Sequence, residues 1–535
     1  MCRATEDLTR PPDSTTLSMD LLAERPGREA PNRRFLSLAV LVLLVFGLIQ
    51  IRWGTVVAEG GGLGFDGQIY AAIAQDLPGA ITQGRLTPYS VQRIVPSTIV
   101  YVTLSVLGVA TGPREVRLAF ALYNLALLVL TVVVWERIAR EVGLGSRGRW
   151  LGFILLFVNL ANLRLPFHYA PLTDTTAFAL GALLVYFYLR GNRPGMLAVL
   201  VLGAFTWRSF IWLGSALFVL PRRPLEARAP SRPPSRAVLV AGALAFAASV
   251  SLYGLGRAPR LVALLSGILV IAYLLIVASG LLGHPALVRA SLYRGAPLRL
   301  GVLVLAGVAV LVLMLWLLPS ASASAPLGDL VGQLYPFRRF FLPRVGRSVA
   351  APALFVVNNA RYFGMVVPLL VLFWPRCGRS AHRLGLGMTV YLAAHLLLAA
   401  NPESRQNIDG LTGAVLVLVL AAEPQLRSAR FFAVVAAGAI AISTVWFPGN
   451  YVGALGLQGR MDGISRGYGS ALPWGHPVFV RQALYVAALG VAVWLVRRPG
   501  TAVRSSSTVT PDAAEDERRS RAARPDGAGA AVLSD

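Results

Sequence analysis

The sequence predicts an all-α polytopic membrane protein, and three observations support this. Of the 535 residues, 56% are hydrophobic, and only 14% are charged, whereas a soluble domain carries about 25% charged residues. The mean hydropathy is +0.63. Apolar runs long enough for a helix to cross the bilayer recur from Phe35 to Val496, which predicts a bundle of about 13 to 14 transmembrane helices.

The charge is strongly basic, with 50 arginines against 25 acidic residues and a net charge of +25. In a soluble protein such a balance would indicate nucleic acid as a partner. Here the arginines lie between apolar runs, where they set membrane topology, so we expect no nucleic-acid partner. Cys2 and Cys377 both fall in segments assigned to the cytoplasm, so no disulfide is expected.

Both ends of the chain are polar and rich in arginine. Residues 1–34 and 499–535 carry too little apolar surface to fold, so we expect disordered cytoplasmic tails around a membrane domain at 35–498. The pair Arg33-Arg34 before an apolar run resembles a signal sequence. Because no small-residue cleavage site follows, we interpret the run as a retained first span.

Spans are expected wherever an apolar run is long enough to cross the hydrocarbon core. The expected spans are 35–51, 116–138, 150–165, 175–190, 196–220, 237–256, 261–283, 300–319, 353–374, 384–400, 410–422, 431–447 and 479–496.

Two segments are ambiguous, and the positive-inside rule decides between their alternatives. If 94–110 crossed the membrane, the arginine-rich loop 136–149 would face outside, so we place 94–110 as an interfacial helix in the external loop 52–115. A single crossing by 196–220 would likewise expose five arginines that follow it. A hairpin of two short helices turning at Arg208 avoids this.

With these choices, the six internal loops hold 19 arginines in 69 residues, a higher density than in the external loops. The sequence thus predicts a multi-pass protein of the cell membrane with both termini in the cytoplasm. The external loops are 52–115, 320–352 and 448–478, with two short ones at 166–174 and 401–409. Chemistry is therefore expected outside the cell membrane.

The first external loop holds Asp66 directly after a glycine-rich stretch, and glycines let a backbone approach a ligand closely. A carboxylate at the membrane surface can take a proton from an attacking hydroxyl. Alternatively, Asp66 is the N-cap of a helix at Gln68–Leu77.

The second external loop ends with Thr173 and Asp174 before a span. Asp174 could position an acceptor or bind a metal ion, or either residue could cap the helix. His168 is a candidate substrate contact, although an interfacial role is the simpler interpretation because no second His or Cys stands at metal-ligand spacing.

External arginines are candidates for binding phosphate, because guanidinium groups bind it in a bidentate manner. Arg338, Arg339 and Arg344 lie among Tyr and Phe residues, a pattern that also fits nonspecific attraction to anionic lipid. Arg405 lies in a nine-residue loop held at the membrane face. Arg93 is a further candidate.

The layout resembles the GT-C superfamily of membrane glycosyltransferases, most closely the bacterial enzymes that use polyprenyl-phosphate sugars and distantly the GPI-anchor mannosyltransferases. The resemblance rests on Phe65-Asp66-Gly67-Gln68-Ile69-Tyr70 after the first span, Arg93-Ile94-Val95-Pro96, and Pro171-Leu172-Thr173-Asp174 before the fourth span. It implies a GT-C-like bundle and an inverting hexosyltransferase.

By this resemblance, Asp66 would be the general base and Asp174 a helper for the acceptor or a metal. Phosphate of the lipid-linked sugar donor would be bound by Arg338, Arg339, Arg344 and Arg405, and substrate by Gln68, Tyr70, Arg93 and His168. Many family members carry a second acidic residue where this chain has Gly67, which leaves open the need for a divalent metal, Mg or Mn.

The expected function is transfer of a sugar from a polyprenyl phosphate to a glycan or protein acceptor of the cell envelope, with membrane lipid as a further partner. Two alternatives stay open: a lipid or glycan transporter or flippase, and a non-catalytic subunit of a cell-envelope assembly.

Overall fold

The computed structural model describes residues 32–57, 59–225, 235–255, 259–289, 293–318, 348, 354–401, 403–443 and 476–497. The chain divides into a large unit, Met1–Leu495, and a small C-terminal unit, Val496–Asp535. Most of the two predicted tails and of the external loops 320–352 and 448–478 lies outside the described residues. The same holds for Arg338, Arg339 and Arg344.

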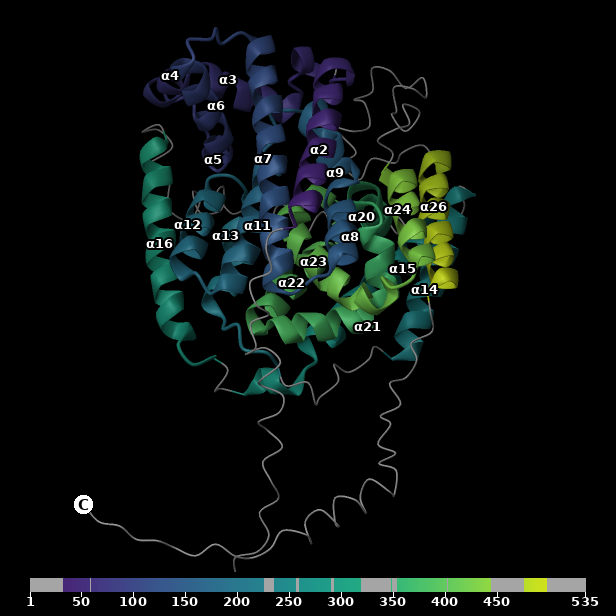
Figure 1. Cartoon of the computed structure of the whole chain (residues 1–535). Helices are drawn as coiled ribbons and strands as arrows, with labels where there is room; N and C mark the ends of the chain where they lie inside the picture. Colours follow the sequence, from purple (N-terminus) through teal and green to yellow (C-terminus); the bar gives the residue numbers. More distant parts are fainter. Residues whose placement is uncertain are drawn as a thin grey trace, which may run out of the picture. The chain divides into compact units, whose positions relative to one another are not determined.

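Every regular element in the described ranges is a helix (Figure 1). The first group, up to residue 219, is α2 (Arg33–Trp53), η1 (Glu59–Gly62), α3 (Phe65–Gln75), α4 (Leu77–Thr82), α5 (Pro88–Val91), α6 (Ile94–Val106), α7 (Pro113–Glu141), α8 (Ser146–Phe157), α9 (Leu160–Leu163), α10 (Leu165–His168), α11 (Asp174–Arg190), α12 (Arg193–Ala204) and α13 (Phe210–Val219).

The second group begins with two long apolar helices and ends near the C-terminus. It comprises α14 (Arg236–Gly254), α15 (Pro259–Val277), the π-helix η2 (Ala278–Leu282), η3 (Pro285–Val288), α16 (Ala296–Leu317), α20 (Leu354–Phe363), α21 (Val366–Leu384), α22 (Leu386–Leu398), the 3-10 helix η5 (Ser404–Gly410), α23 (Leu411–Ala422), η6 (Glu423–Gln425), α24 (Ala429–Ser443) and α26 (His476–Val496).

Six helices of the described residues are long and apolar enough to cross a membrane, or eight if each of two bent pairs is one span. The all-α prediction is thus confirmed for these residues, and the length and apolar character of their helices fit a multi-pass membrane protein. The expected number of about 13 to 14 spans also counts shorter helices, and it stays a prediction.

The two ambiguous segments are short helices. Helix α6 has 13 residues, about 20 Å of helix, which is less than the roughly 30 Å of the hydrocarbon core. The predicted break near Arg208 is confirmed, because α12 ends at Ala204 and α13 starts at Phe210. The helix expected at Gln68–Leu77 is present as α3, which starts three residues earlier.

The predicted span at 353–374 contains a sharp bend within its described residues. Helices α20 and α21 meet at an angle of 105°, at Gly364, whose φ of +61° lies in the left-handed region. The predicted internal segment 375–383 is helical, because α21 continues through it to Leu384. Buried Cys377 and Ala381 alternate with exposed Arg379 and Arg383 at helical spacing, a pattern that average hydropathy conceals.

Loops predicted to lie inside contact one another. Arg190 Nη1 is 2.7 Å from Glu141 Oε1, and Arg147 donates to the carbonyl of Leu426 at 2.8 Å. The amide of Leu225 donates to the carbonyl of His382 at 3.0 Å. These residues belong to five of the six loops assigned to the inside, so the predicted loops gather at one end of the helices.

Loops predicted to lie outside meet separately. The amide of Val57 donates to the carbonyl of His168 at 3.0 Å, and the external loops around Asp66 and Arg405 also meet. Helix α7 runs between the two groups for 29 residues, about 40 Å. Among the described residues, these internal and external segments therefore lie at opposite ends of α7.

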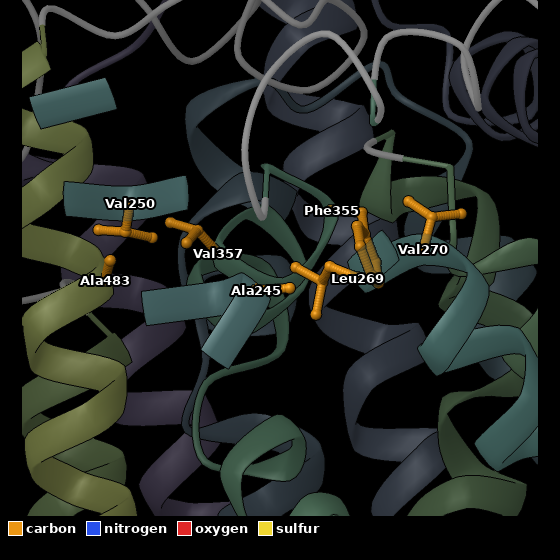
Figure 2. Packing of buried hydrophobic residues seen from close by; sticks show 7 residues of the cluster. All are labelled: Ala245, Val250, Leu269, Val270, Phe355, Val357 and Ala483. Atoms are coloured by element: carbon orange, nitrogen blue, oxygen red, sulfur yellow. The ribbon is translucent and has the colours of Figure 1, made fainter. Parts of the chain in front are cut away.

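One apolar cluster holds the first half of the bent pair in place. Ala245 and Val250 of α14, Leu269 and Val270 of α15, Phe355 and Val357 of α20 and Ala483 of α26 are all buried together (Figure 2). Burial of these apolar side chains away from water stabilises α20 in this position. It therefore fixes where the last turn of α20 lies. That last turn carries Tyr362, which reaches the candidate site.

The separation of the two groups of loops predicts opposite labelling of two exposed positions. Gln83 lies in the loop 52–115 and Ser146 at the start of α8, and both are exposed. In a Cys2→Ser chain, whose remaining Cys377 is buried, we expect an impermeant thiol reagent to label Gln83→Cys in intact cells. Ser146→Cys should react only after permeabilisation. Labelling of both from the same side would contradict the topology.

Candidate functional site

The glycine-rich stretch brings α3 against Tyr169, the residue that follows α10. Gly60, Gly61, Gly62 and Gly64 all have positive φ values. A Cβ on Gly64 would lie 2.2 Å from the ring of Tyr169, so only glycine allows this approach. The hydroxyl of Tyr169 accepts a hydrogen bond of 3.4 Å from the amide of Gly67, in the first turn of α3.

Asp66 lies at the second position of α3, and its side chain is 36% exposed. The N-cap of α3 is Gly64, so the capping alternative for Asp66 is wrong. Its Oδ2 instead accepts a hydrogen bond of 2.8 Å from the hydroxyl of Tyr89, which lies on α5. The N-terminal position in the helix favours the negative charge of this carboxylate.

Two tyrosines form a hydrogen-bonded chain that ends on Asp66. Tyr70 donates to the hydroxyl of Tyr89 at 3.3 Å, and the two rings stack 15° from parallel. Burial raises the pKa of Tyr70 well above its usual value, although nearby Arg93 lowers it, so Tyr70 stays a neutral donor. Tyr70 was expected to contact substrate, but here it is buried and supports Tyr89.

Arg405 joins the two aspartates. Its Nε is 3.5 Å from Asp174 Oδ1 and its Nη1 is 3.9 Å from Asp66 Oδ2. The side chain of Arg405 is 9% exposed and that of Asp174 is 6% exposed. A buried guanidinium and a buried carboxylate compensate each other, whereas either alone would carry a large desolvation cost.

Asp174 is the first residue of α11, and it also accepts a hydrogen bond of 3.0 Å from the hydroxyl of Tyr362 on α20. The capping alternative is wrong here too, because the N-cap Thr173 makes no side-chain cap bond. Arg405 can approach because Gly181 of α11 has no side chain. A Cβ there would lie 2.1 Å from the carbonyl oxygen of Asp409, in the same 3-10 helix as Arg405.

Beside these carboxylates lies a group of cations and aromatic rings, which we name the cationic cluster: Arg93, Arg208, Arg405, Tyr89 and Trp207. The guanidinium carbon of Arg93 is 4.0 Å from the ring centre of Tyr89 and 5.6 Å from that of Trp207. Arg208 is 5.5 Å from Tyr89, and Arg405 is 5.3 Å from Trp207. Such contacts stabilise cations in a desolvated place.

The cationic cluster is brought together by a backbone contact. The amide of Val95, in the first turn of α6, donates to the carbonyl of Phe205 at 3.2 Å. Arg93, the N-cap of α6, therefore lies beside the break that holds Trp207 and Arg208.

Two groups in the cluster call for an anionic partner. Arg93 is 3% exposed, and no carboxylate of the described chain lies within ion-pair distance of it. The indole N–H of the fully buried Trp207 has no acceptor among the described residues. An oxyanion would satisfy both groups.

The remaining predicted residues, Gln68 and His168, contact other parts of the fold. Gln68 is exposed and lies beside Gly60. His168 is buried, and its Nδ1 is 2.8 Å from the carbonyl of Thr55. This bond ties α10 to the end of α2. The structural interpretation of His168 fits this geometry.

The site does not fit a metal ion held between the two aspartates. Carboxylate oxygens are ligands that Mg²⁺ and Mn²⁺ prefer, but Arg405 already supplies the positive charge within 4 Å of both. Within the described residues, no three His, Cys, Asp or Glu side chains are grouped as metal ligands. We therefore derive no step through a metal.

Sequence reasoning missed Tyr89, Trp207 and Tyr362 as site residues. Aromatic side chains in apolar runs are typical of membrane interfaces and cores, so their identity alone gives no signal. Arg208 did carry a signal, since a charge within an apolar run is rare and functional in most cases.

Comparisons with known proteins give no relative: no family model, no curated protein and no solved structure matches the chain.

The close approach of Tyr169 to Gly64 predicts that substitution of Gly64 costs more stability than substitution of Gly61, a glycine of similar backbone conformation. Gly64→Ala should destabilise the protein by about 1–3 kcal/mol, because the ring or α3 must move. Gly61→Ala is the matched control, since φ is also positive there but no atom lies within 4 Å. Thermal unfolding in detergent measures both, and equal losses would contradict the packing argument.

Proposed function

We propose that the protein is an inverting membrane glycosyltransferase of the GT-C type, which moves a sugar from a polyprenyl phosphate to an acceptor on the external face of the cell membrane. One observation carries the proposal. A partly exposed carboxylate, Asp66, lies within ion-pair distance of the buried Arg405. Arg405 belongs to a cationic cluster whose buried Arg93 has no carboxylate within ion-pair distance among the described residues.

Asp66 would act as the general base. Tyr89 and Arg405 both contact its Oδ2, and this arrangement leaves Oδ1 to accept the proton of an acceptor hydroxyl. The fixed hydrogen bond from Tyr89 orients the carboxylate, as a general base requires. The acceptor would be a glycan or a protein of the cell envelope.

The cationic cluster would bind the phosphate of the donor. Arg93 and Arg405 would stabilise its oxygens, and the indole N–H of Trp207 would donate to one of them. The acceptor oxygen then bonds to the anomeric carbon as the bond from that carbon to the phosphate oxygen breaks. The proton goes to Asp66, and the electron pair leaves with the polyprenyl phosphate.

The surroundings of Asp66 support a membrane-bound donor. Phe65 and Ile69 are 47% and 43% exposed on α3, one turn apart. Exposed apolar groups at this spacing suit a lipid interface. The proposal includes an external site, cytoplasmic termini and about 13 to 14 spans. Arg338, Arg339 and Arg344 would add further contacts to the phosphate or to anionic lipid.

Asp66→Asn should lower the rate of sugar transfer by about 10²- to 10⁴-fold while the protein stays folded, because the amide cannot take the proton. Radiolabelled lipid-linked donor with purified protein measures the transfer. The matched control is Asp76→Asn, a carboxylate in the same loop that caps α4 and pairs with Arg85. Near-normal turnover by Asp66→Asn would remove Asp66 from its proposed role.

Arg93→Gln should weaken binding of the donor by about tenfold or more, since a charge-assisted contact to phosphate is lost. The control is Arg85→Gln, because Arg85 is exposed and pairs with Asp76 outside the cluster. Unchanged affinity in Arg93→Gln would contradict the phosphate site. Movement of donor across vesicles without cleavage would favour a transporter, and binding without turnover would favour a non-catalytic subunit.

A further inference from the structure

Helix α21 has an exposed side that the proposed function does not use. Val371, Pro375, Arg379 and Arg383 follow one another at a spacing of four residues, and all four are exposed. Residues four apart are neighbours on the surface of a helix. The exposed side of α21 therefore begins with an apolar side chain, Val371, which is 70% exposed, and ends with two guanidinium groups.

This side of α21 lies far from the candidate site. The hydroxyl of Tyr188, near the end of α11, donates at 3.1 Å to the carbonyl of Leu384, the last residue of α21. Asp174 starts the same 17-residue helix α11, about 25 Å away along its axis. The bend of 105° also turns α21 almost perpendicular to α20, a direction that suits a helix lying along a membrane surface.

A second basic segment joins α21 through a contact between aromatic rings. Phe373 of α21 and Phe431 of α24 are both buried, and their ring centres lie 5.9 Å apart in an edge-to-face contact. Arg430 directly precedes Phe431. The guanidinium carbon of Arg376 is 5.8 Å from the ring centre of Phe373. The arginines of the two segments therefore belong to the same part of the surface.

This part of the surface is strongly basic. Helix α21 and the segment 423–430, which runs into α24, contain five arginines and one acidic residue, Glu423. The buried Nη1 atom of Arg376 has no hydrogen-bond partner among the described residues. A buried guanidinium N–H that lacks an acceptor within the fold suits an oxyanion supplied from outside the chain. The charge and this donor together indicate an anionic partner.

The apolar start of the exposed side indicates which anion fits. A soluble polyanion would leave Val371 in water, whereas the acyl region of a lipid would cover it. Arginines at an interface bury their apolar stems and hold the guanidinium group among the headgroups. There the guanidinium group can bind phosphate in a bidentate manner.

We propose that α21 lies along the cytoplasmic surface of the membrane, where Arg376, Arg379 and Arg383 bind the phosphate headgroups of anionic phospholipids. Val371 reaches the acyl region beside them. The inference goes beyond sugar transfer, because it concerns the end of the helices opposite to the candidate site. It takes only the choice of leaflet from the predicted orientation.

The test measures the affinity of the purified protein in detergent for phosphatidylglycerol and for phosphatidylcholine by native mass spectrometry. The wild-type protein should prefer phosphatidylglycerol by about tenfold or more, and added salt should weaken this preference. Arg379→Gln/Arg383→Gln should remove most of the preference, because two contacts to the headgroup are lost. Both residues are exposed, so the fold should persist, which thermal unfolding checks.

The matched control is Arg137→Gln/Arg294→Gln, which removes the same charge from two exposed arginines in other segments assigned to the inside. It should keep the wild-type preference. Equal losses in the two double variants would indicate nonspecific attraction and overturn the inference. A wild-type protein without the preference would overturn it whether or not the variants fold. Displacement of the lipid by equimolar glycerophosphoglycerol, the headgroup without acyl chains, would also overturn it by indicating a site for soluble anions.

Discussion

The geometry of the candidate site depends on one buried cation, Arg405. Carboxylates at short range stabilise a guanidinium removed from water, and here Asp174 and Asp66 supply them at 3.5 and 3.9 Å. The three residues lie on η5, α11 and α3, so their attraction joins segments up to 339 positions apart in the sequence. If Arg405 moved, both carboxylates would lose their common partner.

Glycines allow these charges to meet, because a side chain at the same positions would hold the neighbouring segments apart. Gly181 admits the backbone of η5 against α11, and Gly64 admits the ring of Tyr169 against α3. A larger residue at Gly181 would push η5, which carries Arg405, away from α11, and one at Gly64 would push α3, which carries Asp66, away from Tyr169. Close packing and electrostatics thus act at the same few positions.

The sequence predicted the helical class, the alternation of the loops and the individual residues Asp66, Asp174 and Arg405, because apolar length and charge near a membrane have strong physical consequences. It could not predict the bend at Gly364, since hydropathy averages over an amphipathic helix such as α21. Nor could it identify Tyr89 or Trp207. Their importance comes from the cations that pack on them, which only the tertiary structure brings together.

Because Asp66 and Arg405 lie within ion-pair distance, their attraction would change as charge moves during the proposed reaction. Before transfer, a donor phosphodiester carries one negative charge, which would pair with Arg93 and Arg405 of the cationic cluster. As the bond to the sugar breaks, the leaving phosphate gains negative charge, while Asp66 gains a proton and becomes neutral. The attraction of Asp66 for Arg405 therefore weakens when the phosphate needs the guanidinium most. If Arg405 paired with Asp174 alone, its attraction to the site would not shift from the base, Asp66, to the leaving phosphate during the reaction.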